Sequence, residues 1–109
     1  MAAYPALVQL ARLLGRAETL AALGAETEPD PAALAPEQRE RLAELLDARL
    51  ESVASELAGE AAASDDVTSR EAGMTWVEDR IAAFADLLRA DQAERLRSET
   101  ARLLEEWER

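Results

Sequence analysis

Residues 41–57 read Arg-Leu-Ala-Glu-Leu-Leu-Asp-Ala-Arg-Leu-Glu-Ser-Val-Ala-Ser-Glu-Leu, and this stretch decides the fold. Its large apolar residues recur at steps of four, three and four, which places them on one face of an α-helix. This coiled-coil-like seam extends over about two heptads. We expect a helix from about residue 36 to residue 57 that stops at Gly59. The seam residues are Leu46, Leu50, Val53 and Leu57, with Leu42 and Leu45 beside them.

The C-terminal third repeats this spacing twice. A capping box, Thr75-Trp76-Val77-Glu78, predicts the start of the first of these helices. Leu88, the last residue of the first seam, lies eight residues before Leu96, the first residue of the second, whereas a spacing of seven would continue one apolar stripe. The two seams therefore belong either to separate helices or to one long helix with a kink near 89–91. The run 91–94 resembles a second helix start and favours the interruption. The two seams are Val77, Ile81, Phe84 and Leu88, and then Leu96, Thr100, Leu103 and Trp107.

Residues 1–24 form an N-terminal apolar helix in this interpretation. Pro5 suits the first turn, Gly24 suits the C-terminal cap, and Gly15 marks a place for a break or bend. Residues 25–35 are rich in proline and polar residues and form a linker. The broad apolar face of the helix is the best candidate for a partner-binding surface, and the alternative is that it packs on its own bundle. The face consists of Leu7, Val8, Leu10 and Leu14.

Composition and periodicity together predict an all-α fold. Ala and Leu occupy 25 and 17 positions, whereas Val and Ile together occupy five, too few for a β-rich domain. We expect a small bundle or bent helical hairpin of about four helices, with residues 36–109 as the hairpin and a loop near 59–74. Narrow seams bury little surface in a small monomer, so we also expect a homodimer or a stable contact with a different protein, with the seam residues in the core or in the dimer interface.

The charge of the chain restricts its partners. The formal net charge is −11, and it is uneven: residues 1–24 carry +1, whereas residues 25–58 and 59–109 carry −6 each. This balance disfavours nucleic acids and anionic membranes, which leaves protein partners. No uncharged apolar run is long enough for a transmembrane segment. No basic residue precedes the N-terminal apolar run, so the sequence as written predicts a cytoplasmic protein.

The sequence offers little chemistry. It contains no Cys and no His, so thiol chemistry, the commonest general base and the commonest metal ligand are all missing. The many carboxylates follow no metal-binding or catalytic spacing, and we interpret them as a solvated face. We therefore expect no catalytic residues, no metal, no cofactor and no enzymatic activity.

One nine-residue pattern occurs twice. Both copies read Leu-x-x-acid-Gln-x-Glu-Arg-Leu, the first from Leu34 to Leu42 and the second from Leu88 to Leu96. In helical geometry Gln38 and Gln92 should lie beside the apolar seam, where an amide can donate and accept hydrogen bonds. We expect these amides to satisfy backbone groups at a helix start or kink. The alternative is coincidence, because Pro and acidic residues commonly open a helix.

The paired Leu-x-x-x-Gln segments resemble the LTxxQ motifs of the Spy/CpxP family of bacterial envelope proteins, with Ala35 and Arg89 at the threonine position. The aromatic-led run 84–87 before the second copy is similar too. The resemblance covers about residues 34–107 and implies a bent helical hairpin that dimerises into a cradle, with the motif residues shaping the hairpin. It also implies an ATP-independent chaperone, stress-response modulator or metal-linked sensor in the periplasm, after removal of a signal peptide.

Two functional hypotheses follow. The first is a non-enzymatic, chaperone-like or adaptor protein of the Spy/CpxP type that binds protein partners. The second is a dedicated acidic partner, such as an inhibitor, an antitoxin-like factor or an accessory subunit, that covers a basic surface of one target. Affinity that falls steeply as salt rises is expected of the second hypothesis.

Overall fold

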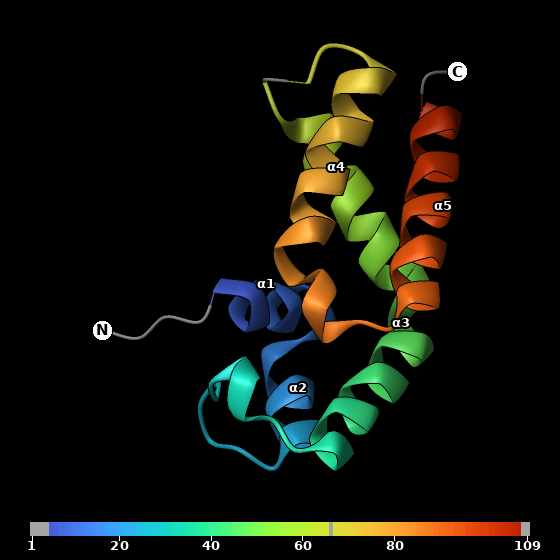
Figure 1. Ribbon diagram of the computed structural model, residues 1–109. Helices are drawn as coiled ribbons and strands as arrows, with labels where there is room; N and C mark the ends of the chain where they lie inside the picture. The colour runs from blue at the N-terminus through green and yellow to red at the C-terminus, as the bar shows by residue number, and fades with distance from the viewer. Residues whose placement is uncertain (1–4, 66, 108–109) are drawn as a thin grey trace.

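The structure is a computed structural model that describes residues 5–65 and 67–107, the side chain of Trp107 excepted. This part of the chain is helical and has no strand, which confirms the all-α prediction (Figure 1). The elements in chain order are α1 (Pro5–Leu14), α2 (Arg16–Leu23), the 3₁₀ helix η1 (Pro31–Ala33), α3 (Pro36–Ala63), α4 (Arg70–Phe84), the 3₁₀ helix η2 (Ala85–Leu87) and α5 (Ala90–Trp107).

Three long helices form the body of the fold. Helices α3 and α5 lie side by side and run parallel, since Arg89 pairs with Glu40 and Arg95 pairs with Asp47 further along both helices (Figure 1). Helix α4 runs the opposite way, because Arg70 at its start pairs with Glu105 near the end of α5. The two short helices complete the fold, with α1 packed on α3 and α4, and α2 packed on α3.

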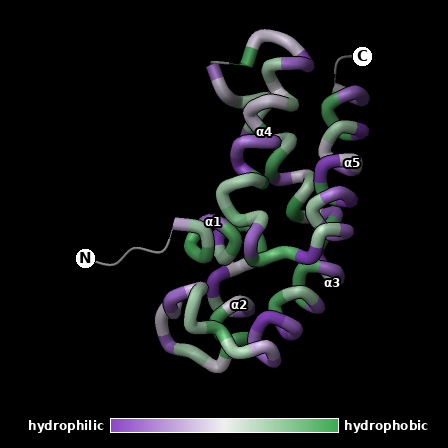
Figure 2. The backbone as a smooth tube through the Cα atoms, in the orientation of Figure 1, coloured by the Kyte–Doolittle hydropathy of each residue, from purple (hydrophilic) through white to green (hydrophobic). Residues whose placement is uncertain are grey.

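The described residues share one apolar core. It takes side chains from α1, α2, α3, α4, η2 and α5, and most of its members are leucines. Apolar and polar residues are interspersed along the helices (Figure 2), and the apolar residues of each α-helix include members of this core. The largest fully buried side chains include Phe84, Leu7, Leu10, Leu14, Leu42, Leu46, Leu57, Ile81 and Leu96.

The predicted seams lie inside this single chain. Leu46, Val53, Leu57, Val77, Ile81 and Phe84 are buried, and Leu45, Leu50, Leu88 and Leu103 are partly buried against the core. On α5 the fully buried stripe runs through Leu96, Thr100 and Leu104, and the predicted Leu103 lies beside it, partly buried against the core. The Trp107 side chain, which was also predicted in this seam, lies outside the described residues. The seams therefore supply no argument for a dimer.

The N-terminal apolar segment is two helices, not one. Gly15 separates α1 from α2 with φ +99° and ψ 118°, a conformation that only glycine adopts readily. The predicted cap at Gly24 is confirmed, since its φ of 65° is left-handed and its N–H bonds back to the last turn of α2. The break at Gly15 lets α1 and α2 lie in different directions against α3.

The predicted loop at 59–74 is much shorter in the structure. Helix α3 continues to Ala63 and α4 already begins at Arg70, so both Gly59 and Gly73 lie within helices. The predicted capping box at Thr75 was wrong for the same reason. Ser69 caps α4 by accepting a hydrogen bond from Ala72 N at 3.1 Å, and the Thr75 hydroxyl donates to the Glu71 carbonyl inside the helix.

The interruption predicted near 89–91 is confirmed. Helix α4 ends at Phe84, η2 follows at once, and α5 begins at Ala90.

No helix in the described residues is both long and apolar enough to cross a membrane.

Candidate functional site

The two motif glutamines occupy the same place at the start of two different helices. Gln38 is the third residue of α3, and its Oε1 accepts a hydrogen bond from Ala35 N at 2.7 Å. Its Nε2 donates to the carbonyl of Leu23, the last residue of α2, at 3.0 Å. One amide thus satisfies the amide N–H just before α3 and a free carbonyl at the end of α2.

Gln92 repeats this arrangement at the start of α5. Its Oε1 accepts from Arg89 N at 3.1 Å, and its Nε2 donates to the Ala43 carbonyl of α3 at 2.7 Å. The same Nε2 lies 2.9 Å from Asp47 Oδ1. Gln92 is fully buried, whereas Gln38 is half-buried. The predicted bonding of backbone groups by both amides is confirmed, although the partner helix differs between the copies.

The backbone in front of each helix is also repeated. In both copies a 3₁₀ helix is followed by a leucine in extended conformation, Leu34 with ψ 129° and Leu88 with ψ 157°. The next residue, Ala35 or Arg89, precedes the helix. A threonine at such a position would cap the helix, and a glutamine three residues later would complete a capping box. In this chain the glutamine supplies its half of such a box in both copies.

The two copies lie against each other. The Arg39 guanidinium donates to the Pro31 carbonyl at 3.0 Å and to the Asp86 carbonyl at 3.4 Å, so it bridges η1 and η2. In the other direction, Arg89 of the second copy pairs with Glu40 of the first. These cross-links fix the start of α5 beside the first turns of α3.

Asp47 joins this network although no sequence pattern marked it. Its Oδ1 lies 2.6 Å from Arg95 Nη2, and its Oδ2 lies 3.9 Å from Arg89 Nη1. The hydrogen bond from Gln92 holds the pKa of the Asp47 carboxyl below its usual range, and the Arg95 and Arg89 guanidinium groups add to this effect. Asp47 is therefore an anionic acceptor that fixes α5 on α3.

The N-terminal helix does not present the surface predicted for a partner. Leu7 and Leu10 are fully buried and Leu14 is 1% exposed, all within the chain's own core. Exposing a side chain of this kind costs about 1.5–3 kcal/mol, so releasing all three would cost as much as many whole domains are stable. The prediction that these leucines bind a partner was wrong, because the chain itself covers them. Val8 alone of the predicted four is exposed, at 44%.

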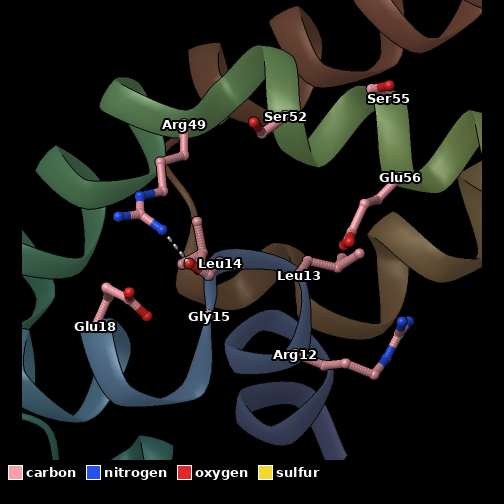
Figure 3. A pocket seen from close by; sticks show the side chains of 9 residues that line it. All are labelled: Arg12, Leu13, Leu14, Gly15, Glu18, Arg49, Ser52, Ser55 and Glu56. Carbon is pink, nitrogen blue, oxygen red and sulfur yellow. Dashed lines mark hydrogen bonds between the residues drawn. The ribbon is translucent and has the colours of Figure 1, made fainter.

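A hollow of about 530 Å³ lies where α1 and α2 meet α3 (Figure 3). Its lining combines opposite charges with hydroxyl groups, and Arg49 reaches across one end to the backbone of Leu14 (Figure 3). Within the described residues no group of three or more potential metal ligands comes together. The hollow is lined by Arg12, Leu13, Leu14, Gly15, Glu18, Arg49, Ser52, Ser55 and Glu56.

The ionisable side chains stay at the surface. Among the described residues, the polar side chains that are buried belong to Thr19, Gln92 and Thr100, and none of these carries a charge. Thr19 and Thr100 each donate to the carbonyl four residues earlier in their own helices. The described carboxylates and guanidinium groups are thus all solvated in part, in agreement with the interpretation of the acidic residues as a solvated face.

No protein family, curated protein or solved structure matches the chain.

Proposed function

We propose that this protein is a non-enzymatic helical interaction protein whose acidic surface binds a basic surface of one protein partner. The observation that carries the proposal is the division between core and surface. The apolar seams pack inside one chain whose formal net charge is −11. The charged side chains of the described residues all keep some contact with solvent. A surface of one dominant sign steers a protein toward partners of the opposite sign.

Exposed carboxylates remain without an arginine partner after the ion pairs among the described residues are taken into account. Many arginines of the described chain are paired with carboxylates or with backbone carbonyls. On α4, Glu71, Glu78 and Asp79 are exposed and take no part in the ion pairs that the described residues form. These carboxylates are available to a cationic partner.

The burial of the apolar residues favours an acidic protein with one basic partner over a general chaperone. A protein that holds many unfolded clients needs an exposed apolar surface, since clients expose apolar residues. Among the described residues, Val8 is the large apolar side chain that is exposed, and single exposed residues of this kind are ordinary.

A chaperone-like or adaptor protein of the Spy/CpxP type is the second candidate. It is favoured by the repeated construction of the two helix starts, in which Gln38 and Gln92 bind the amide of the residue before each helix. This candidate implies a homodimer and, after removal of a signal peptide, a periplasmic location. The sequence as written predicts a cytoplasmic location, and neither candidate calls for a cofactor or nucleic acid.

Affinity purification of the tagged chain from its own organism at low and high salt separates the two candidates. We expect one stoichiometric basic protein that is retained at low salt and lost at high salt. A matched variant with Glu71→Gln, Glu78→Gln and Asp79→Asn should retain less of it. Many substoichiometric clients that persist at high salt would contradict the proposal and favour the chaperone-like candidate.

A further inference from the structure

Trp76 is a large aromatic residue of α4 that the apolar core covers only in part. It packs against the core from outside, whereas Val77 and Ile81 on the same helix are fully buried. The guanidinium carbon of Arg80 lies over the Trp76 ring, 4.7 Å from the ring centroid. At this distance the cation is attracted by the negative face of the ring. Trp76 thus already holds one guanidinium group, which comes from its own helix.

Arg80 is only weakly held in this position. Its side chain is exposed and takes part in none of the ion pairs that the described residues form. A contact between a cation and an aromatic ring contributes little when both groups still meet water. A cation of the same kind from another molecule can therefore replace Arg80 over the ring at small cost.

The positions next to Trp76 on α4 favour an incoming cation. Residues three and four positions apart are neighbours on the surface of a helix. Asp79, three positions after Trp76, is exposed and also takes part in none of the ion pairs of the described residues. Ala72, four positions before it, has a side chain too short to reach across the ring. A cation on the Trp76 ring would therefore lie near a carboxylate that has no arginine partner, and the two charges attract.

We propose that Trp76 anchors the partner by taking one of its arginine side chains in place of Arg80. The inference rests on the proposed function, because the exposed carboxylates of α4 are what attract a basic protein to this helix. The occupant is a segment of that protein with arginines three or four residues apart, one stacked on Trp76 and the next paired with Asp79 or Glu78. Lysine fits less well, since its compact, strongly hydrated ammonium does not stack as a plane. Tryptophan and arginine are also the residue types that most often dominate binding energy at interfaces.

Two synthetic helical peptides of equal length and charge test the anchor, one with arginine and one with lysine at every third or fourth position. Calorimetric titration measures the affinity of each for the native chain and for Trp76→Leu. We expect Trp76→Leu to weaken the arginine peptide by about two- to fivefold and the lysine peptide by a smaller factor. Trp76→Phe keeps a smaller ring and should lie between the two proteins, and it serves if the leucine variant does not fold. Equal losses for both peptides in a folded Trp76 variant overturn the inference.

Arg80→Ala tests the exchange, with Arg41→Ala as its matched control. Each variant removes one exposed positive charge, but only Arg80→Ala uncovers the Trp76 ring. We expect Arg80→Ala to tighten the arginine peptide more than Arg41→Ala does, and equal effects would contradict the exchange.

The same titrations distinguish failure of this inference from failure of the proposed function. If Glu71→Gln, Glu78→Gln and Asp79→Asn together weaken both peptides while Trp76→Leu has no selective effect, the acidic surface stands and the anchor is wrong. If neither peptide binds the native chain at low salt, both the anchor and the acidic surface are contradicted.

Discussion

Gln38 and Gln92 are each the third residue of a helix, and each connects the backbone N–H just before its helix to a backbone carbonyl of a different helix. The two glutamines differ in how deeply they are buried. Gln92 is fully buried between α3 and α5, whereas Gln38 is half-buried at the end of α2. This difference makes the two copies of the motif unequal in their contribution to stability.

Gln92→Leu should destabilise the fold more than Gln38→Leu. Removing the buried amide leaves Arg89 N without its acceptor and places an apolar group beside Asp47, which costs about 1–3 kcal/mol. Water can replace the lost bonds at Gln38, so about 1 kcal/mol is expected there. Urea unfolding followed by circular dichroism measures both. An equal or larger loss for Gln38→Leu would contradict the inequality.

Ala35→Thr should stabilise the protein. It supplies a capping hydroxyl before α3, where Gln38 already provides the other half of a capping box, and this change contributes about 1 kcal/mol. Ala82→Thr is the matched control, because residue 82 is exposed in the last turn of α4, away from any helix start, and threonine there lowers helix propensity by a few tenths of a kcal/mol. Thermal unfolding of the two variants should shift in opposite directions. A lower midpoint for Ala35→Thr would count against our assignment of the helix start.

Asp47 should make the fold sensitive to acid. Its pKa is lowered in the folded protein, so the stability it contributes is present above the ordinary pKa of about 4 and is lost as pH falls through the lower folded value. Asp47→Asn should therefore be less stable than the native chain at neutral pH, with a difference that shrinks below that range. Urea midpoints across pH measure this. Glu44→Gln, on the same helix, serves as the control, and a difference independent of pH would contradict the role of Asp47.

Alanine substitutions at the two glycines with positive φ, Gly15 and Gly24, should destabilise the protein by different amounts. Gly24→Ala adopts the left-handed helical region at a cost of about 1 kcal/mol, and a side chain there meets no other atom within 4 Å. Gly15→Ala should cost more, because a residue with a Cβ adopts φ +99° with ψ 118° less readily than the left-handed helical region. Chemical denaturation of both variants ranks them. Equal losses would show that the break at Gly15 relaxes easily.

The sequence predicts features that depend on neighbouring residues. The cap at Gly24, the interruption before α5 and the bonds from Ala35 N to Gln38 and from Arg89 N to Gln92 involve groups a few residues apart, and they leave a local pattern. The start of α4 was misplaced because residues 59–74 are small, polar and acidic, and because Thr75 and Glu78 match a capping box. In the structure Gly73 lies inside the helix, where a Cβ would come within 3.4 Å of Val67 and 3.5 Å of Leu104.

Contacts between residues far apart in the sequence leave no local pattern from which they could be predicted. Asp47 meets Gln92, and Arg49 meets Leu14, across separations of 45 and 35 residues. Each of these charged residues resembles any other exposed residue on an acidic helix. The burial of Leu7, Leu10 and Leu14 likewise depends on how α1 turns at Gly15, and periodicity alone does not distinguish a core face from a docking face.

The most direct test of the proposed function is the salt dependence of affinity for the protein that co-purifies with the chain. Calorimetric titration at several salt concentrations should give an affinity that falls steeply as salt rises. The variant with Glu71→Gln, Glu78→Gln and Asp79→Asn should bind more weakly at low salt and converge with the native chain at high salt. An affinity that stays constant with salt, and that neutralising these carboxylates does not change, would contradict an acidic binding surface.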